Sequence, residues 1–161
     1  MNITFKGNPV TLVGKQLQVN DVMPCFPLVK NDLSELRCEE GKRIYLSVPS
    51  LDTGICSMEV AKFMEYMKAY SDVLCYSVSM DLPFALERWC QAKENEQVIT
   101  TSDYKYREFA KATGTLVEEL GLLTRAVFVV DENNVIRHVE YLAEIANEPN
   151  YDAILNAVAT L

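Results

Sequence analysis

Apolar positions recur along this chain with two different periods. Residues 43–48, 73–79 and 98–101 are short runs rich in β-branched and aromatic residues, as is typical of buried strands. Between the first two runs, apolar residues recur every three or four positions, as on one face of a helix: Val60, Phe63, Met64 and Met67. Strand, helix and strand in this order predict a right-handed βαβ unit.

Turn residues predict less regular elements on both sides of this unit. Residues 3–13 predict a small hairpin that turns at positions 7–9, and residues 126–141 predict a second hairpin. Residues 24–41 contain two prolines at their start and a glycine at their end, and we expect an irregular segment there.

Three more helices are expected, over residues 81–90, 106–113 and 150–158. The first has a proline placed for its opening turn, and the second is followed by Gly114, a typical helix stop. The order of strands and helices favours an α/β sandwich of the thioredoxin type with an N-terminal β-hairpin. We expect one domain over residues 1–161.

The charge and hydropathy of the chain limit the classes of partner that it can bind. Its 161 residues carry a formal net charge of −8, so the chain offers nucleic acid no basic surface. No apolar run approaches the ~18 residues of a membrane span. The first residues lack the basic and apolar regions of a secretory signal. We therefore expect a cytoplasmic protein with no nucleic-acid or membrane partner.

The chain has five cysteines and a single histidine. No two cysteines have the two-residue gap of a zinc site or a dithiol oxidoreductase, and His138 alone cannot build a multi-histidine metal site. We therefore expect no metal and no other cofactor. An odd cysteine count without an export signal argues against a structural disulfide framework. Cys25, Cys38 and Cys75 are accordingly expected to be inert, buried thiols.

Cys56 has a distinctive place at the start of the first predicted helix. Thr53, or Asp52 before it, is a good N-cap for this helix. If Thr53 is the N-cap, Cys56 is the third helical residue, and its sulfur lies beside backbone N–H groups that lack helical partners. Such a position favours the thiolate, which is the nucleophilic form of cysteine. Taken singly, each residue also has a simpler interpretation: Thr53 as an ordinary cap, Cys56 as a core residue, and Arg125 as the solvated start of a strand.

Several blocks of the sequence together resemble one family. Residues 49–56 read Pro-x-x-x-Thr-x-x-Cys, which is the peroxidatic motif of peroxiredoxins. Residues 79–90 are similar to the resolving-cysteine helix of the bacterial thiol peroxidases, the atypical two-cysteine branch. Residues 122–132 resemble the segment that carries the active-site arginine of that branch. The N-terminal hairpin and the start of the last helix also look like the family's, so the resemblance spans the whole chain.

Two positions depart from the family's pattern. Gly54 stands where many members have proline, which loosens the loop before the helix but leaves the motif intact. Cys25 stands where an aspartate is common. An additional disulfide or a regulatory thiol at Cys25 therefore stays open as an alternative.

The resemblance implies a role for each motif residue. Cys56 would attack a peroxide oxygen and become a sulfenic acid, and Cys90 would resolve it as an intramolecular disulfide. Thr53 would align thiolate and peroxide, and Arg125 would stabilise the charge that develops on the departing oxygen. Pro49 would shape the pocket and exclude water.

The resemblance also implies substrates and partners. It implies reduction of hydrogen peroxide and alkyl hydroperoxides, in antioxidant defence, with thioredoxin as the reductant and a homodimer as the assembly. Two other classes compete with this interpretation. A disulfide reductase on the same fold is disfavoured because the chain has no Cys-x-x-Cys pair. A non-catalytic binding module is disfavoured because the motif residues are intact, and His138 is expected to be structural or exposed.

Overall fold

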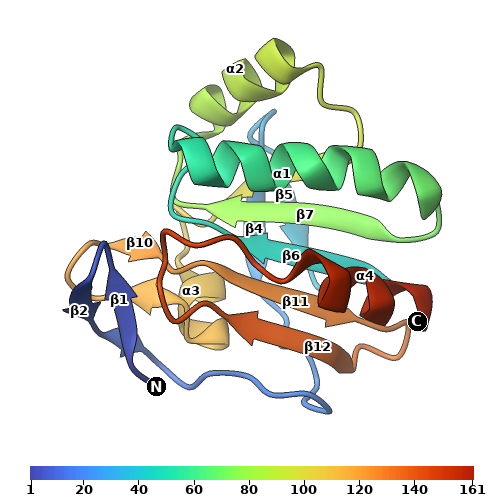
Figure 1. The fold of residues 1–161 in the computed structure, drawn as a ribbon. Coiled ribbons are helices and arrows are strands. Elements are labelled where there is room, and N and C mark those ends of the chain that lie inside the picture. The colour runs from blue at the N-terminus through green and yellow to red at the C-terminus, as the bar shows by residue number, and fades with distance from the viewer.

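A seven-stranded sheet forms the centre of the computed structural model, which describes residues 1–161 (Figure 1). Its strand order is β12-β11-β6-β7-β8-β4-β5. The three middle strands are parallel: β6 (Arg43–Ser47), β7 (Leu74–Ser79) and β8 (Val98–Ser102). Antiparallel pairs extend it on both sides: β11 (Ala126–Val130) with β12 (Ile136–Tyr141), and β4 (Pro27–Lys30) with β5 (Glu35–Arg37).

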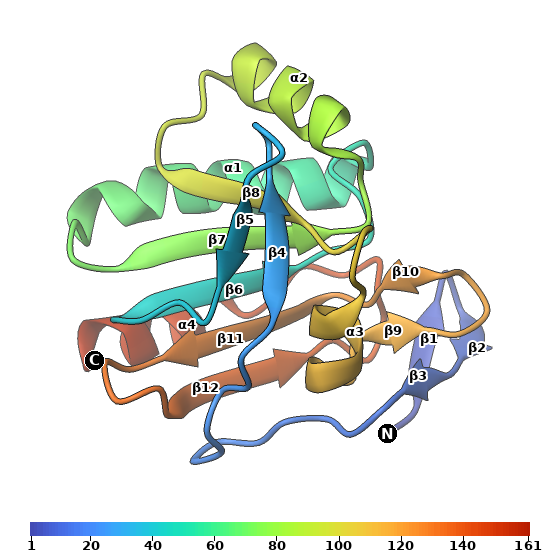
Figure 2. The same cartoon turned by 180° about the vertical axis from the view of Figure 1, so that it is seen from behind.

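Helices cover both faces of the sheet. The helix α1 (Gly54–Tyr66), continued by a 3-10 turn at Met67–Ala69, lies with α4 (Tyr151–Ala159) on one face (Figure 1). The short α3 (Glu108–Thr113) lies on the other face (Figure 2). The helix α2 (Pro83–Lys93) crosses beyond one edge of this arrangement, above α1 in Figure 1. The expected α/β sandwich is confirmed.

Each face of the sheet has its own hydrophobic core. Alternation along β6 directs Ile44 and Leu46 toward the α1 side, where they pack with Val60 and Phe63. Tyr45 points to the opposite side, into a largely aromatic core. The sheet thus separates the start of α1 from everything that packs around Tyr45.

The small N-terminal elements differ in detail from the sequence-based expectation. The first hairpin pairs β1 (Ile3–Phe5) with β2 (Asn8–Val10) and turns at Lys6-Gly7, one residue before the expected turn. Both turn residues have positive φ, as a tight two-residue hairpin turn requires. The adjacent β3 (Leu12–Val13) leaves this hairpin and joins β9 (Leu116–Val117) and β10 (Leu122–Leu123) in a separate sheet.

The expectation of an irregular segment at 24–41 is wrong. This stretch forms the β4–β5 hairpin at the edge of the sheet. Pro27 is the first residue of β4, and a strand tolerates proline at its first position. No helix in the structure is both long and apolar enough to cross a membrane.

Candidate active site

Cys56 is the third residue of α1, as the sequence predicts. Thr53 is the N-cap in extended backbone conformation, and its hydroxyl accepts a hydrogen bond from the Cys56 N–H (3.4 Å) while donating to the Ser50 carbonyl (2.9 Å). Pro49 is buried in the short connection between β6 and α1. The predicted motif therefore folds as one compact loop and helix start.

Arg125 meets Cys56 inside the protein rather than at the surface. It immediately precedes β11, whose first residue pairs with Ser47 at the end of β6, so sheet register brings the guanidinium to the start of α1. Arg125 Nη2 donates to Cys56 Sγ (3.1 Å), and Nε donates to the Ile145 carbonyl (2.8 Å). The alternative of a solvated strand start is wrong, because only 2% of the Arg125 side chain is exposed.

Glu59 is a member of this site that sequence reasoning missed. It lies one helical turn after Cys56, is fully buried, and accepts from Arg125 Nη1 through Oε2 at 2.5 Å. Its other oxygen, Oε1, has no hydrogen-bond partner. Burial raises the pKa of Glu59 to about 7, and Arg125 only partly offsets this effect. The available signal was a lone acidic residue on an otherwise apolar helix stripe, three positions after Cys56.

The guanidinium of Arg125 is shared between two acidic partners. Burial disfavours its charged form, but Glu59 and Cys56 outweigh burial and raise the pKa of Arg125. Arg125 therefore stays positively charged, and a hydrogen bond from a charged donor stabilises a thiolate more than a neutral one does. The sulfur of Cys56 thus has a fixed, charged hydrogen-bond donor beside it.

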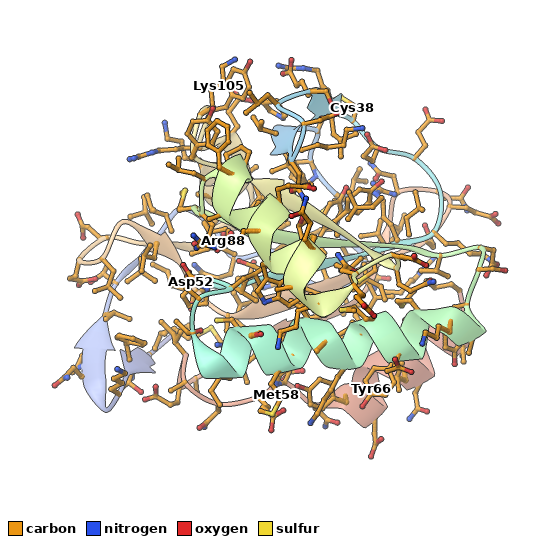
Figure 3. The ribbon with its side chains drawn as sticks, turned by 90° about the horizontal axis from the view of Figure 1, so that it is seen from above. Cys38, Asp52, Met58, Tyr66, Arg88 and Lys105 are labelled. Atoms are coloured by element: carbon orange, nitrogen blue, oxygen red, sulfur yellow. A yellow bond between two sulfur atoms is a disulfide. The ribbon has the colours of Figure 1, made fainter.

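The loop before α1 is tied to the segment before α2. Asp81 accepts from the Ser50 hydroxyl (2.7 Å) and from the Leu51 N–H (2.8 Å). Asp81 was expected to open α2, but the N-cap of α2 is Leu82, without a side-chain cap. An exposed ion pair of Arg88 with Asp52 (3.9 Å) joins this loop to α2 itself; both residues are labelled in Figure 3.

Cys90 lies near the end of α2 and is half-buried. The hydrogen-bond partners of its sulfur are all neutral: the amides of Asn95 (3.2 Å) and Asn31 (3.5 Å), and the hydroxyl of Thr100 (3.2 Å). A groove of about 710 Å³ opens beside it, lined by these residues and by several carboxylates. The neighbouring Trp89 donates to Ser57 of α1 (3.0 Å), so α2 packs directly against the helix turn of Cys56.

The expectation for the remaining cysteines is confirmed in one case and wrong in two. Cys75 is a free, buried thiol whose pKa is raised by burial and further by Glu59. Cys25 and Cys38 are not inert buried thiols, because both are exposed and they form a disulfide with each other. They face one another across the open end of the β4–β5 hairpin, an arrangement created by strand pairing. Cys56 and Cys90 are free thiols in this structure.

Comparisons with known proteins agree with this arrangement. The Redoxin family matches residues 18–155, and a thiol peroxidase of Oceanobacillus iheyensis is 44% identical, covering 96% of each chain. The chain belongs to the thiol peroxidase family of the redoxins. The Bacillus subtilis thiol peroxidase is likewise 44% identical, covering 99% of this chain and 97% of its own.

Solved structures of a peroxiredoxin-like protein and of a thiol peroxidase share the fold of this chain. A peroxiredoxin-like protein from Aquifex aeolicus superposes with a TM-score of 0.93 at 39% identity, covering 99% of this chain and 96% of its own. A thiol peroxidase from Chromobacterium violaceum shares the fold, with a TM-score of 0.90 at 17% identity over 99% of this chain and 96% of its own. The predicted family, fold and enzyme class, a peroxiredoxin-type peroxidase, are confirmed.

Proposed function

We propose that Cys56 is the peroxidatic cysteine and Cys90 the resolving cysteine of this peroxidase. The observation that carries the proposal is the 3.1 Å contact between the buried Arg125 guanidinium and Cys56 Sγ at a helix start. A charged donor fixed in a water-excluded site stabilises developing negative charge without reorganisation. Cys56 is the free cysteine with a cationic partner, since Cys90 has neutral neighbours and Cys75 only an unfavourable acidic one.

The first step oxidises Cys56. Its thiolate attacks one oxygen of the hydroperoxide, the S–O bond forms as the O–O bond breaks, and the other oxygen leaves as water or an alcohol after taking up a proton. Arg125 is placed to donate to the sulfur and to the departing oxygen. Thr53 holds the helix start in line, and Pro49 helps keep water out.

The second step closes a disulfide. The Cys90 sulfur attacks the Cys56 sulfenic acid, water leaves, and an intramolecular disulfide forms. The two sulfurs have entirely separate neighbours in the reduced protein, Arg125 for one and Asn31, Asn95 and Thr100 for the other. Closing the bond therefore requires the first turn of α1 and the end of α2 to rearrange.

A dithiol then reduces the Cys56–Cys90 disulfide by thiol–disulfide exchange and is itself oxidised to a disulfide, which returns the enzyme to its starting state. Thioredoxin as that dithiol, a homodimer as the assembly and the cytoplasm as the location belong to the same proposal, and they rest on the family resemblance. Reduction of hydrogen peroxide and of alkyl hydroperoxides is part of it as well. A coupled assay that follows peroxide-dependent turnover in the presence of thioredoxin and its reductase tests directly whether thioredoxin is the reductant.

Two serine variants separate the roles of the cysteines. In Cys90→Ser we expect one stoichiometric burst of peroxide consumption, then accumulation of sulfinic acid on the Cys56 peptide, because the sulfenic acid has no resolving thiol. In Cys56→Ser the burst itself should vanish. Steady thioredoxin-dependent turnover by Cys90→Ser at the wild-type rate would show that another thiol resolves, and a burst in Cys56→Ser would exclude Cys56 as the nucleophile.

A further inference from the structure

The Cys25–Cys38 disulfide lies apart from the proposed peroxidatic site. Its neighbours include Tyr45 and Arg43, and Tyr45 points to the face of the sheet opposite Cys56. In Figure 3, Cys38 and Met58 of α1 lie on opposite sides of the molecule. This disulfide is therefore distinct from the proposed Cys56–Cys90 pair.

The disulfide is open to reagents from solution. Both of its cysteines are exposed, and they line a cavity of about 500 Å³ on the surface. Exposed disulfides are the ones that exchange with external thiols, whereas buried ones are protected. An external dithiol can attack either sulfur, form a mixed disulfide, and leave with the electrons exchanged: two cysteine thiols are produced and the dithiol becomes a disulfide.

The β4–β5 hairpin connects this disulfide to Cys90. The disulfide closes the base of the hairpin, where Pro27 pairs with Arg37, and Asn31 begins the turn at its tip. Asn31 Nδ2 contacts Cys90 Sγ (3.5 Å), and Asn31 Oδ1 accepts from the Thr100 hydroxyl (2.7 Å). Figure 2 shows this hairpin in front of the sheet, with its tip rising toward α2.

Besides the disulfide, the packing of Phe26, Leu28 and Leu36 in the core around Tyr45 and a short hydrogen-bond ladder hold the hairpin in place. The strand β5 pairs only with β4, and β4 is bonded to the rest of the sheet through only the pairs Val29↔Ser102 and Lys30↔Thr101. Short edge strands of this kind are among the first parts of a sheet to open. A covalent link at the base limits that opening, and so helps keep Asn31 against the Cys90 thiol.

We propose that the Cys25–Cys38 pair is a second redox site whose state sets how readily Cys90 leaves its resting position to resolve Cys56. This inference rests on the proposed roles of Cys56 and Cys90. With the disulfide formed, Asn31 and Thr100 retain Cys90 beside the groove. Reduction by a dithiol loosens the hairpin and removes the contact of Asn31 with Cys90, whereas Thr100 stays in place on β8. Reoxidation by a hydroperoxide turns one thiol into a sulfenic acid, and the other thiol condenses with it, releasing water.

The test measures the two steps separately in single turnovers of variants whose cysteine states are mapped by differential alkylation. In Cys25→Ser/Cys38→Ser the formation of Cys56 sulfenic acid should keep its wild-type rate. The conversion of sulfenic acid to disulfide should become about two- to tenfold faster, the worth of an ordinary hydrogen bond. Sulfinic acid on Cys56 should correspondingly require more peroxide.

Two tip variants keep the disulfide intact and control for folding. Asn31→Ala should reproduce the faster resolution, because it removes the contact to Cys90 directly. Ser34→Ala, at the same tip but bonded only to Asp32 and the backbone, should not. A lower unfolding temperature alone would be the mark of a merely structural disulfide.

Equal resolution rates in the double serine variant and in wild-type protein with the disulfide mapped as intact would overturn the proposal, as would a wild-type protein in which Cys25 and Cys38 are never linked. Failure of the proposed function has a different readout, since no sulfenic acid would then form on Cys56 in the wild-type protein.

Discussion

The two cysteines that we propose to react, Cys56 and Cys90, have opposite kinds of surroundings. Cys56 is buried, and its sulfur accepts from a guanidinium that is itself anchored to Glu59 and to a main-chain carbonyl. Cys90 sits at the rim of an open groove among neutral amide and hydroxyl groups. Interactions with a full charge are strongest where water is excluded, whereas neutral hydrogen bonds near solvent are cheaply exchanged. The proposed nucleophile is thus held in a fixed charged contact, and its proposed resolving partner is held by weaker contacts that allow it to move.

The two regions place different demands on the proposed reaction. Cys56 needs little motion to react but must be reached by peroxide, since its side chain is fully buried. Cys90 is accessible but must travel. The hydrogen bond between Trp89 and Ser57, and the ties from Asp81 to Ser50, connect the two regions and must change together when the disulfide forms.

The largest effect is expected at the charged contact of Cys56. Arg125→Ala should lower kcat/KM for peroxide by about 10²–10³, the range seen when one transition-state donor is removed. Leaving Glu59 buried without its partner should also destabilise the fold by about 3–5 kcal/mol, so the variant Arg125→Ala/Glu59→Gln serves as the folded control. The measurements are stopped-flow peroxide reduction and urea unfolding. Wild-type kcat/KM in this double variant would show that Arg125 takes no part in the reaction with peroxide.

The second effect is a change of the unfolding free energy with pH. It arises in the buried region around Cys56, not in the exposed region around Cys90. The pKa of Glu59 in the folded protein is about 7, above its ordinary value of 4.5, so the folded state holds this proton more tightly than the unfolded state does. The resulting stability is fully present below pH 4.5 and is lost as pH rises through about 7. The full loss is about 3 kcal/mol for this pKa difference.

Glu59→Gln isolates this contribution. Asp103 also has a pKa raised by burial, to about 6, and produces a slope of the same sign, so only the difference between wild-type and variant proteins is informative. Unfolding free energies measured from pH 4 to 8 should fall less steeply in Glu59→Gln. Parallel pH profiles would show that the pKa of Glu59 is the same in the folded and the unfolded protein, and would contradict a raised pKa.

The smallest effect is expected at the cap of α1. Thr53→Ala removes the hydroxyl that accepts from the Cys56 N–H and should cost about 1 kcal/mol of stability, together with part of the peroxide reactivity. Thr53→Ser keeps the hydroxyl and should restore both properties. Cys90 lies in the other region, so trapping of Cys56 sulfenic acid by Cys90 should be unchanged in Thr53→Ser. A cap variant that lost stability but kept full reactivity would limit Thr53 to a structural role.

Regular periodicity made much of the fold predictable from the sequence. The βαβ unit, the four α-helices and the hairpin of β11 and β12 all follow local patterns. The β4–β5 hairpin does not, because Pro24 and Pro27 are typical of loops and its strands form through pairing of β4 with β5 and with the distant β8. The Cys25–Cys38 disulfide depends on that hairpin: the sequence left an additional disulfide at Cys25 open as an alternative, but it did not indicate Cys38 as the partner.

The candidate site was likewise predictable only where its residues lie close together in the sequence. Pro49, Thr53 and Cys56 form a local motif, and the helix position of Cys56 follows from the cap alone. Glu59 stands out in the sequence only as an acidic residue on an apolar helix stripe, and its partner Arg125 lies 66 positions away, brought to it by the register of β11 and β6. Contacts of this length are set by tertiary packing and leave little trace in local sequence.

The most direct test of the central claim is the mass and disulfide map of the protein after one equivalent of peroxide. Starting from protein with Cys56 and Cys90 as free thiols, the account predicts the loss of two hydrogens and a peptide that links Cys56 to Cys90 within one chain. A link from Cys56 to Cys75, a link between two chains, or an unmodified Cys56 after peroxide is consumed would contradict it.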